Sequence, residues 1–328
     1  RAGKRQGIRD ALSAAPSAWT RLSDAQKGVA LVLAVTFFFS CMDSAAKAMG
    51  ERYNPLMVVW WRYAVAGALT LILLAPSLKR RLRTKRLPAQ IFRSSLLFGA
   101  TILFFIGFSL MPQVDVVALA QVAPLAMTGM AALFLGERVG PWRWLGVAAG
   151  FGGALLVVKP GFSDTGWAAL FPLAGALFFA AYSIATRALG GGEPAEGDGP
   201  AAPGEDPWTT FLYTGLVGAV AATFMIPFTW ETPAAVDLPI LMAAGLFGAL
   251  GQGTLIFALL FAPASLLAPY LYVGLIWGAL FGYVLFNHVP DAFTVAGGGV
   301  IVAAGLFVRW REAQAAQQAE RAAAARAS

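Results

Sequence analysis

Residues 37–49 read FFFSCMDSAAKAM and place two charged side chains, Asp43 and Lys47, inside an otherwise apolar run. The run extends over about residues 28–50, which is long enough for a helix that spans a bilayer. Charged side chains at membrane depth are energetically costly and call for a partner or a functional role. The stretch therefore predicts a membrane-spanning helix that carries an unusual pair of charges.

The rest of the chain repeats this apolar pattern. Of the 328 residues, 58% are hydrophobic and only 12% are charged, whereas an average soluble domain has about 25% charged residues. Ten apolar runs occur, at about residues 28–50, 55–75, 91–111, 116–135, 142–158, 165–189, 208–228, 238–261, 265–286 and 292–309. The composition predicts an all-α integral membrane protein with ten transmembrane helices.

Cysteine and histidine are nearly absent. Cys41 is the single cysteine and His288 the single histidine. One cysteine cannot form an internal disulfide, and one residue of each type makes a His/Cys metal site implausible. We therefore expect no metal and no cofactor.

The basic residues predict the orientation, because cytoplasmic loops carry an excess of Lys and Arg. With a cytoplasmic N-terminus, 20 of the 24 Lys and Arg residues fall on the inner side, including Arg93 near the start of the third run. The outer loops then hold only Arg52 and Lys159. We expect a bacterial inner-membrane protein with both termini in the cytoplasm, a basic leader at 1–27 and a tail at 310–328.

An acidic segment near the middle suggests an internal division. Residues 190–207 read GGGEPAEGDGPAAPGEDP, with five acids and no base, which predicts a disordered linker. Shifting residues 110–158 by 151 positions places them on 261–309 with the same helix, turn and glycine-rich helix pattern, at low identity. We expect two five-helix repeats, 28–160 and 161–309. An odd number of spans makes them inverted, as in many secondary transporters.

Several motifs together resemble the drug/metabolite transporter superfamily, EamA type. They are the D-x-x-x-K pattern of Asp43 and Lys47, Arg62 early in the second run, the turn LFLGERVGPWRWLGVAAGFGGALLVVKPG at 133–161, and YVLFNHVPDAFTVAGGGVIVAAGLFVRWRE at 283–312. The similarity covers about residues 28–312 and is strongest to the branch with S-adenosylmethionine uptake carriers and related amino-acid and metabolite carriers. It differs at Asn287 and His288, where members often carry Gly-Glu.

The resemblance implies ten helices in two inverted halves, a central cavity lined from both halves, and transport by alternating access. We therefore expect a secondary transporter of a small organic metabolite, such as an amino acid, an amine or an S-adenosylmethionine-like solute. The expected partners are this substrate and the lipid bilayer, without nucleic acid, and a homodimer is left open.

The charged residues of the first two runs have two interpretations. Asp43 and Lys47 lie four apart on one helix face, and Arg62 enters the second run to about the same depth at 1.5 Å per residue. The three charges could form a gate or coupling site. They could equally form a buried cluster that holds two helices together, because breaking such a cluster strands a charge.

Polar and aromatic residues within the runs are candidates for the cavity lining. Gln121 could bond across helices or face the cavity, and Pro124 frees a backbone carbonyl near it. The remaining candidates are Tyr182, Gln252, Tyr270, Tyr272 and Trp277. An aromatic pocket with amides suits a flat or cationic solute, while the alternative for aromatic residues is the interfacial belt.

Two rival functions are weighed against a carrier. A membrane-embedded enzyme is disfavoured because the chain has no H-E-x-x-H, no G-x-S-x-G and no phosphate-binding loop. A receptor or scaffold is disfavoured because no sizeable soluble domain is evident. The inverted repeat is expected of a carrier and of neither rival, so we expect that the protein is not an enzyme.

Overall fold

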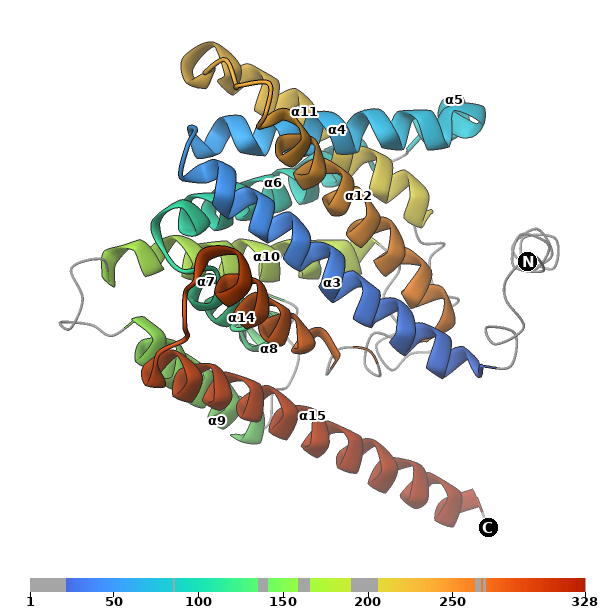
Figure 1. Ribbon diagram of the computed structural model, residues 1–328. Helices are drawn as coiled ribbons and strands as arrows, with labels where there is room; N and C mark the ends of the chain where they lie inside the picture. The colour runs from blue at the N-terminus through green and yellow to red at the C-terminus, as the bar shows by residue number, and fades with distance from the viewer. Residues whose placement is uncertain are drawn as a thin grey trace.

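The computed structural model describes residues 22–84, 86–134, 141–158, 166–189, 206–262, 267 and 270–327, which contain helices and no strand. The acidic segment up to residue 205 and the leader up to residue 21 lie outside the described residues. In chain order the main helices are α3 (Asp24–Gly50), α4 (Pro55–Leu74), α5 (Leu78–Arg81), α6 (Leu87–Leu110), α7 (Gln113–Ala120), α8 (Ala123–Phe134), α9 (Pro141–Val158), α10 (Leu170–Leu189), α11 (Pro207–Thr229), α12 (Leu238–Phe261), α14 (Val273–Phe286) and α15 (Ala292–Ala327). Figure 1 shows them as one bundle.

Seven of the described helices are long and apolar enough to cross a membrane. They include α3, α4, α6, α10, α11, α12 and the first part of α15. Three shorter apolar helices cover Gln113–Met127, Trp144–Val158 and Val273–Phe286. The ten apolar runs of the sequence fall on these helices, and the chain is a multi-pass membrane protein.

The first helix begins at Asp24, four residues earlier than its apolar run. Ser23 caps it: its hydroxyl accepts a bond from the Gln26 amide, and the Gln26 side chain accepts one from the Ser23 amide. This reciprocal capping box satisfies two backbone donors that a helix start leaves free. The polar cap therefore fixes the start of α3, which hydropathy alone cannot locate.

Two of the predicted spans contain breaks. The run at 116–135 is two helices, α7 and α8, separated by a turn at Gln121 and Val122. Pro124 follows, and its missing N–H leaves the carbonyl of Ala120 without its helical donor. In the run at 265–286, residues 270 and 271 are helical, Tyr272 is a turn, and α14 begins at Val273.

Helix α12 packs along α3 and α4 through glycines spaced three apart (Figure 1). A Cβ added at Gly248 would lie 3.1 Å from Met42 Sδ on α3, and one at Gly251 would lie 2.6 Å from the Phe39 ring. Small residues let helix backbones approach closely within a membrane. This packing joins residues far apart in the sequence, because α3 begins at Asp24 and α12 begins at Leu238.

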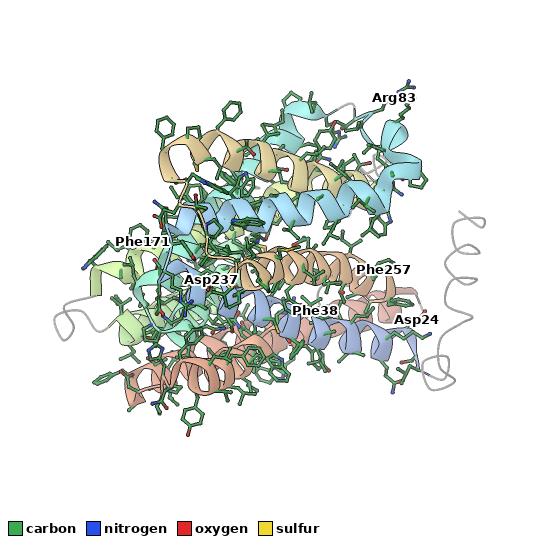
Figure 2. All side chains as sticks on the ribbon, turned by 45° about the horizontal axis from the view of Figure 1, so that its top comes forward. Asp24, Phe38, Arg83, Phe171, Asp237 and Phe257 are labelled. Atoms are coloured by element: carbon green, nitrogen blue, oxygen red, sulfur yellow. The ribbon has the colours of Figure 1, made fainter. Side chains whose placement is uncertain are left out.

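The two ends of the bundle are distinct. Figure 2 shows Arg83 and Asp24 at one end and Asp237 and Phe171 at the opposite end. We call these the basic end and the Asp237 end. The segment expected as a tail, 310–328, continues α15 as helix through Ala327, and Figure 1 shows it extending beyond the other helices.

Candidate functional site

Arg62 lies where four helices meet. From α4, its Nε lies 3.2 Å from Met42 Sδ on α3, and its Nη1 donates to Thr101 Oγ1 on α6 at 3.2 Å. On the α12 side stands Gly248, where a Cβ would come within 3.5 Å of Arg62 Nε. The guanidinium also stacks over the Tyr63 ring at 4.6 Å. Arg62 thus contacts helices from both sequence halves, 28–160 and 161–309.

Asp43 is the acid nearest to this site on α3. Its side chain is half-buried, one residue after Met42, and the charge of Arg62 acts on its carboxylate. Within the described residues the two form no ion pair shorter than 4 Å. The predicted proximity of Asp43 and Arg62 is present, therefore, but as a separated charge pair.

Lys47 bonds elsewhere. It is only 2% exposed, and its ammonium donates to Glu51 Oε1 at 2.7 Å. It also donates to the carbonyl oxygens of Phe108 at 3.2 Å and Met111 at 3.0 Å, at the end of α6. A cation at a helix C-terminus is stabilised by the helix dipole. The structure therefore separates the ammonium of Lys47 from the Asp43–Arg62 pair, which i, i+4 spacing could not reveal.

The two helix breaks meet. The Gln121 amide lies 3.4 Å from the carbonyl oxygen of Leu271, beside the turn at Tyr272. Positions 121 and 272 are 151 residues apart, the same offset as in the repeat expected from the sequence. Broken helices expose backbone polar groups only where protein or an aqueous cavity can satisfy them. This crossing of two breaks, with Pro124 beside it, is the strongest structural sign of a substrate site.

Trp277, on α14 shortly after the break at Tyr272, carries an unpaired hydrogen-bond donor. Its ring packs edge-on against Phe37 on α3, with 5.3 Å between centroids, and lies 6.0 Å from the Phe281 ring. Its Nε1 is buried and has no acceptor among the residues that the structure describes. Gln252, half-buried on α12, forms no hydrogen bond in the described part of the chain. An indole N–H and an amide left unpaired among apolar helices can serve a solute.

The other predicted aromatic residues lie in different surroundings. Tyr270 is 37% exposed on the outside of the described structure. The Tyr272 hydroxyl packs directly against Gly305 on α15, where a side chain would collide with it. Tyr182 is buried on α10, 8% exposed, and its hydroxyl accepts a bond from Arg93. Tyr182 thus belongs to a packed polar contact rather than to an open wall.

Arg93 was missed as a buried residue by the sequence reasoning. It was counted among the basic residues of the cytoplasmic side, and the structure places it in the second turn of α6, where it is 0% exposed. The structural reason is that α6 begins at Leu87, six residues before it. Burial of Arg93 could have been predicted only by knowing its polar partners on other helices. No spacing rule in the sequence links Arg93 to Tyr182.

The Asp237 end is also held by polar contacts between the halves. Asp237 accepts bonds from Arg52 Nη1 and from the Tyr53 hydroxyl, each at 2.7 Å. Thr294 on α15 donates to Asp115 on α7 at 2.6 Å, beside a pocket of about 210 Å³. These bonds tie the start of α12 and of α15 to the N-terminal half.

Comparison with known proteins gives a family match. Residues 26–159 match the EamA-like transporter family. The riboflavin transporter of Rhizobium johnstonii is 35% identical over 208 residues, 63% of this chain and 65% of its own length, which is less than two thirds of that relative. The S-adenosylmethionine uptake transporter of Rickettsia bellii is 27% identical over 84% of this chain and 91% of its own length.

Two further comparisons extend over most of the chain. The pseudopaline exporter CntI of Pseudomonas aeruginosa is 29% identical over 85% of this chain and 94% of its own. A protein crystal structure matches with a TM-score of 0.58 at 18% identity, and the match covers 86% of this chain and 96% of that chain. The fold is therefore shared with a solved structure, and the curated relatives are named as transporters.

Proposed function

We propose that this chain, of which residues 26–159 match the EamA-like transporter family, is a drug/metabolite transporter: a secondary carrier that moves a small organic metabolite across the bacterial inner membrane by alternating access. Transport, rather than catalysis, is what its curated relatives are named for. Their names include both uptake and export.

The observation that carries the proposal is the meeting of the two helix breaks at Gln121 and Leu271. Secondary transporters bind substrate where discontinuous helices of two inverted repeats come together near the membrane midplane. The 151-residue offset between the breaks supports two five-helix repeats, at 28–160 and 161–309. Rocking of the two halves about this crossing would expose the site to each side in turn.

The proposed substrate is an amino acid, an amine or an S-adenosylmethionine-like solute. The Trp277 indole and the Gln252 amide supply an aromatic face and hydrogen-bonding groups for it. Aromatic faces attract organic cations. Gln121 and Pro124 contribute polar backbone and side-chain groups from the other half. Asp43 and Arg62 serve as the coupling or gating pair, beside this region on α3 and α4.

Orientation completes the proposal. The cationic residues Arg81, Arg83 and Arg86 flank the start of α6 at the basic end. Cytoplasmic loops carry such residues, so the basic end faces the cytoplasm together with both termini. The Asp237 end then faces the outside of the inner membrane.

The test is uptake into liposomes that contain the purified protein. A panel of labelled amino acids, polyamines and S-adenosylmethionine is offered with and without a proton gradient, and protein-free liposomes set the background. We expect at least one solute to accumulate or exchange and unlabelled congeners to compete. Absence of uptake or exchange for the whole panel, in protein shown to be folded and in both membrane orientations, would refute the substrate classes proposed.

A further inference from the structure

Arg93 forms the centre of a buried polar cluster at the basic end, and the proposed transport function has so far given this cluster no role. Its guanidinium donates to hydroxyls of Tyr182 at 3.1 Å and Thr186 at 3.3 Å on α10. It also donates to Thr214 Oγ1 at 2.5 Å and to the Thr210 carbonyl at 2.7 Å on α11. One side chain of the N-terminal half thus holds two helices of the C-terminal half.

The charge of Arg93 is not balanced by an acid. Within the described residues no carboxylate forms an ion pair with it. Among the residues that the structure describes, its Nε lacks an acceptor, and one turn away Gln90 Oε1 lacks a donor. Both side chains are 0% exposed. A buried cation held by neutral acceptors retains a large part of its desolvation penalty, because hydroxyls compensate a charge less well than a carboxylate does.

A buried cation whose desolvation penalty is only partly offset by its hydrogen bonds is suited to a contact that must open. Water reaching Arg93 would hydrate the guanidinium and the two unpaired groups, which offsets the hydrogen bonds lost. A carboxylate partner would instead make separation strongly unfavourable. The contact therefore closes the basic end and can also release it.

We propose that Arg93 is a positioning residue for transport: with Ser94, Tyr182, Thr186, Thr210 and Thr214 it forms a latch that closes the basic end, and its release opens that end. The inference rests on the proposed rocking of the two halves. Loss of one hydroxyl from the latch should favour the state that is open at the basic end. It should not loosen the Asp237 end, where Arg52 and Asp237 hold the halves together.

The experiment measures opening by cysteine labelling and needs no substrate. Cys41 is the sole cysteine, so Cys41→Ser provides a background free of thiols. Leu97→Cys reports on the basic end, because Leu97 is 6% exposed one turn beyond Arg93 on α6. Met49→Cys reports on the Asp237 end, where Met49 is 1% exposed. Protein in lipid nanodiscs is labelled with a polar maleimide, so both faces are accessible.

The latch variants are Tyr182→Phe and Thr214→Val, which remove one hydroxyl each. Hydrogen bonds to charged groups are strong enough that each loss should raise the labelling rate of Leu97→Cys about tenfold. The matched control is Ser183→Ala, because the Ser183 hydroxyl bonds only within α10, to the carbonyl of Phe179. We expect this control to leave the rate unchanged.

The outcomes separate the latch from the carrier proposal. A rise at Leu97→Cys without a rise at Met49→Cys supports the latch, even in a chain that transports none of the tested solutes. An unchanged rate in both hydroxyl variants, with thermal unfolding like that of the parent, overturns the latch while leaving transport untouched. Equal rises at both reporters also overturn it, since they indicate general loosening. If Tyr182→Phe fails to fold, Thr214→Val decides alone.

Discussion

The ammonium of Lys47 bonds to Glu51, 2.7 Å away on the next turn of α3, while the carboxylate four residues earlier, Asp43, faces the charge of Arg62 instead. A buried lysine thus anchors one helix end, and an acid beside it remains available for another role. This division separates a structural residue from a candidate coupling residue within one turn of helix.

The anchoring role of Lys47 predicts a loss of stability. In Lys47→Met, the carbonyl oxygens of Phe108 and Met111 lose a buried donor, so we expect destabilisation by about 2 kcal/mol. Glu51→Gln should change stability by less than about 1 kcal/mol, because the Glu51 side chain is 45% exposed. Unfolding in detergent micelles measures both, and equal losses in the two variants would contradict the anchor.

The proposed coupling role of Asp43 predicts a change in energetics. Asp43→Asn removes the carboxyl group proposed to gain and lose a proton with the gradient, so uptake should become independent of that gradient while exchange continues. The matched control is Asp24→Asn, because Asp24 lies on the same helix with a side chain 75% exposed. Proton-driven uptake that persists at the parent level in Asp43→Asn would exclude the coupling role.

The unpaired indole of Trp277 predicts an effect on substrate affinity. Trp277→Phe keeps an aromatic ring and removes an N–H that has no internal acceptor, so the fold should lose little stability. If that N–H serves the solute, KM should rise about tenfold. Trp61→Phe is a matched control, because its Nε1 is also buried and unpaired. Equal KM values for the parent and Trp277→Phe would remove Trp277 from the site.

At the crossing of α9 and α15, we expect the stability of the protein to depend strongly on which glycine of α15 is given a side chain. A Cβ at Gly297 would lie 2.5 Å from the carbonyl oxygen of Gly153, so Gly297→Ala must push two backbones apart. We expect destabilisation by about 1–3 kcal/mol. At Gly299 nothing lies within 4 Å of the added atom, and Gly299→Ala should be neutral. Thermal unfolding of the two variants side by side measures the difference, and similar midpoints would show that the crossing is looser.

Most of the helices could be predicted from the sequence, because hydropathy adds up over the length of a membrane-spanning helix. Hydropathy summed over about 20 residues located each apolar helix, although α14 begins only at Val273 and α15 continues as helix to Ala327, beyond its apolar run. Boundaries shifted where polar caps act, as at Ser23 before α3. Breaks inside the runs at Gln121 and Tyr272 were not predicted, since a turn of one or two residues leaves the average hydropathy unchanged.

The site was only partly accessible for a different reason. Spacing placed Asp43 and Lys47 on one face and Arg62 at the same depth, yet it could not say which charge each would meet. Tyr182 fitted the composition of a cavity wall, but a buried arginine on another helix occupies its hydroxyl. Partners in a helix bundle are set by how helices cross, and crossing is not encoded in local spacing.

The sequence by itself determined that the chain is a multi-pass helical membrane protein, with charges at Asp43, Lys47 and Arg62 inside its apolar runs. These follow from the cost of polar groups in a bilayer, which acts residue by residue. Only the tertiary structure decided that Lys47 anchors α6, that Arg93 is buried between α10 and α11, and that the two breaks meet. Such contacts join residues more than 60 positions apart, and they arise only when small residues such as Gly248 let particular helices pack together.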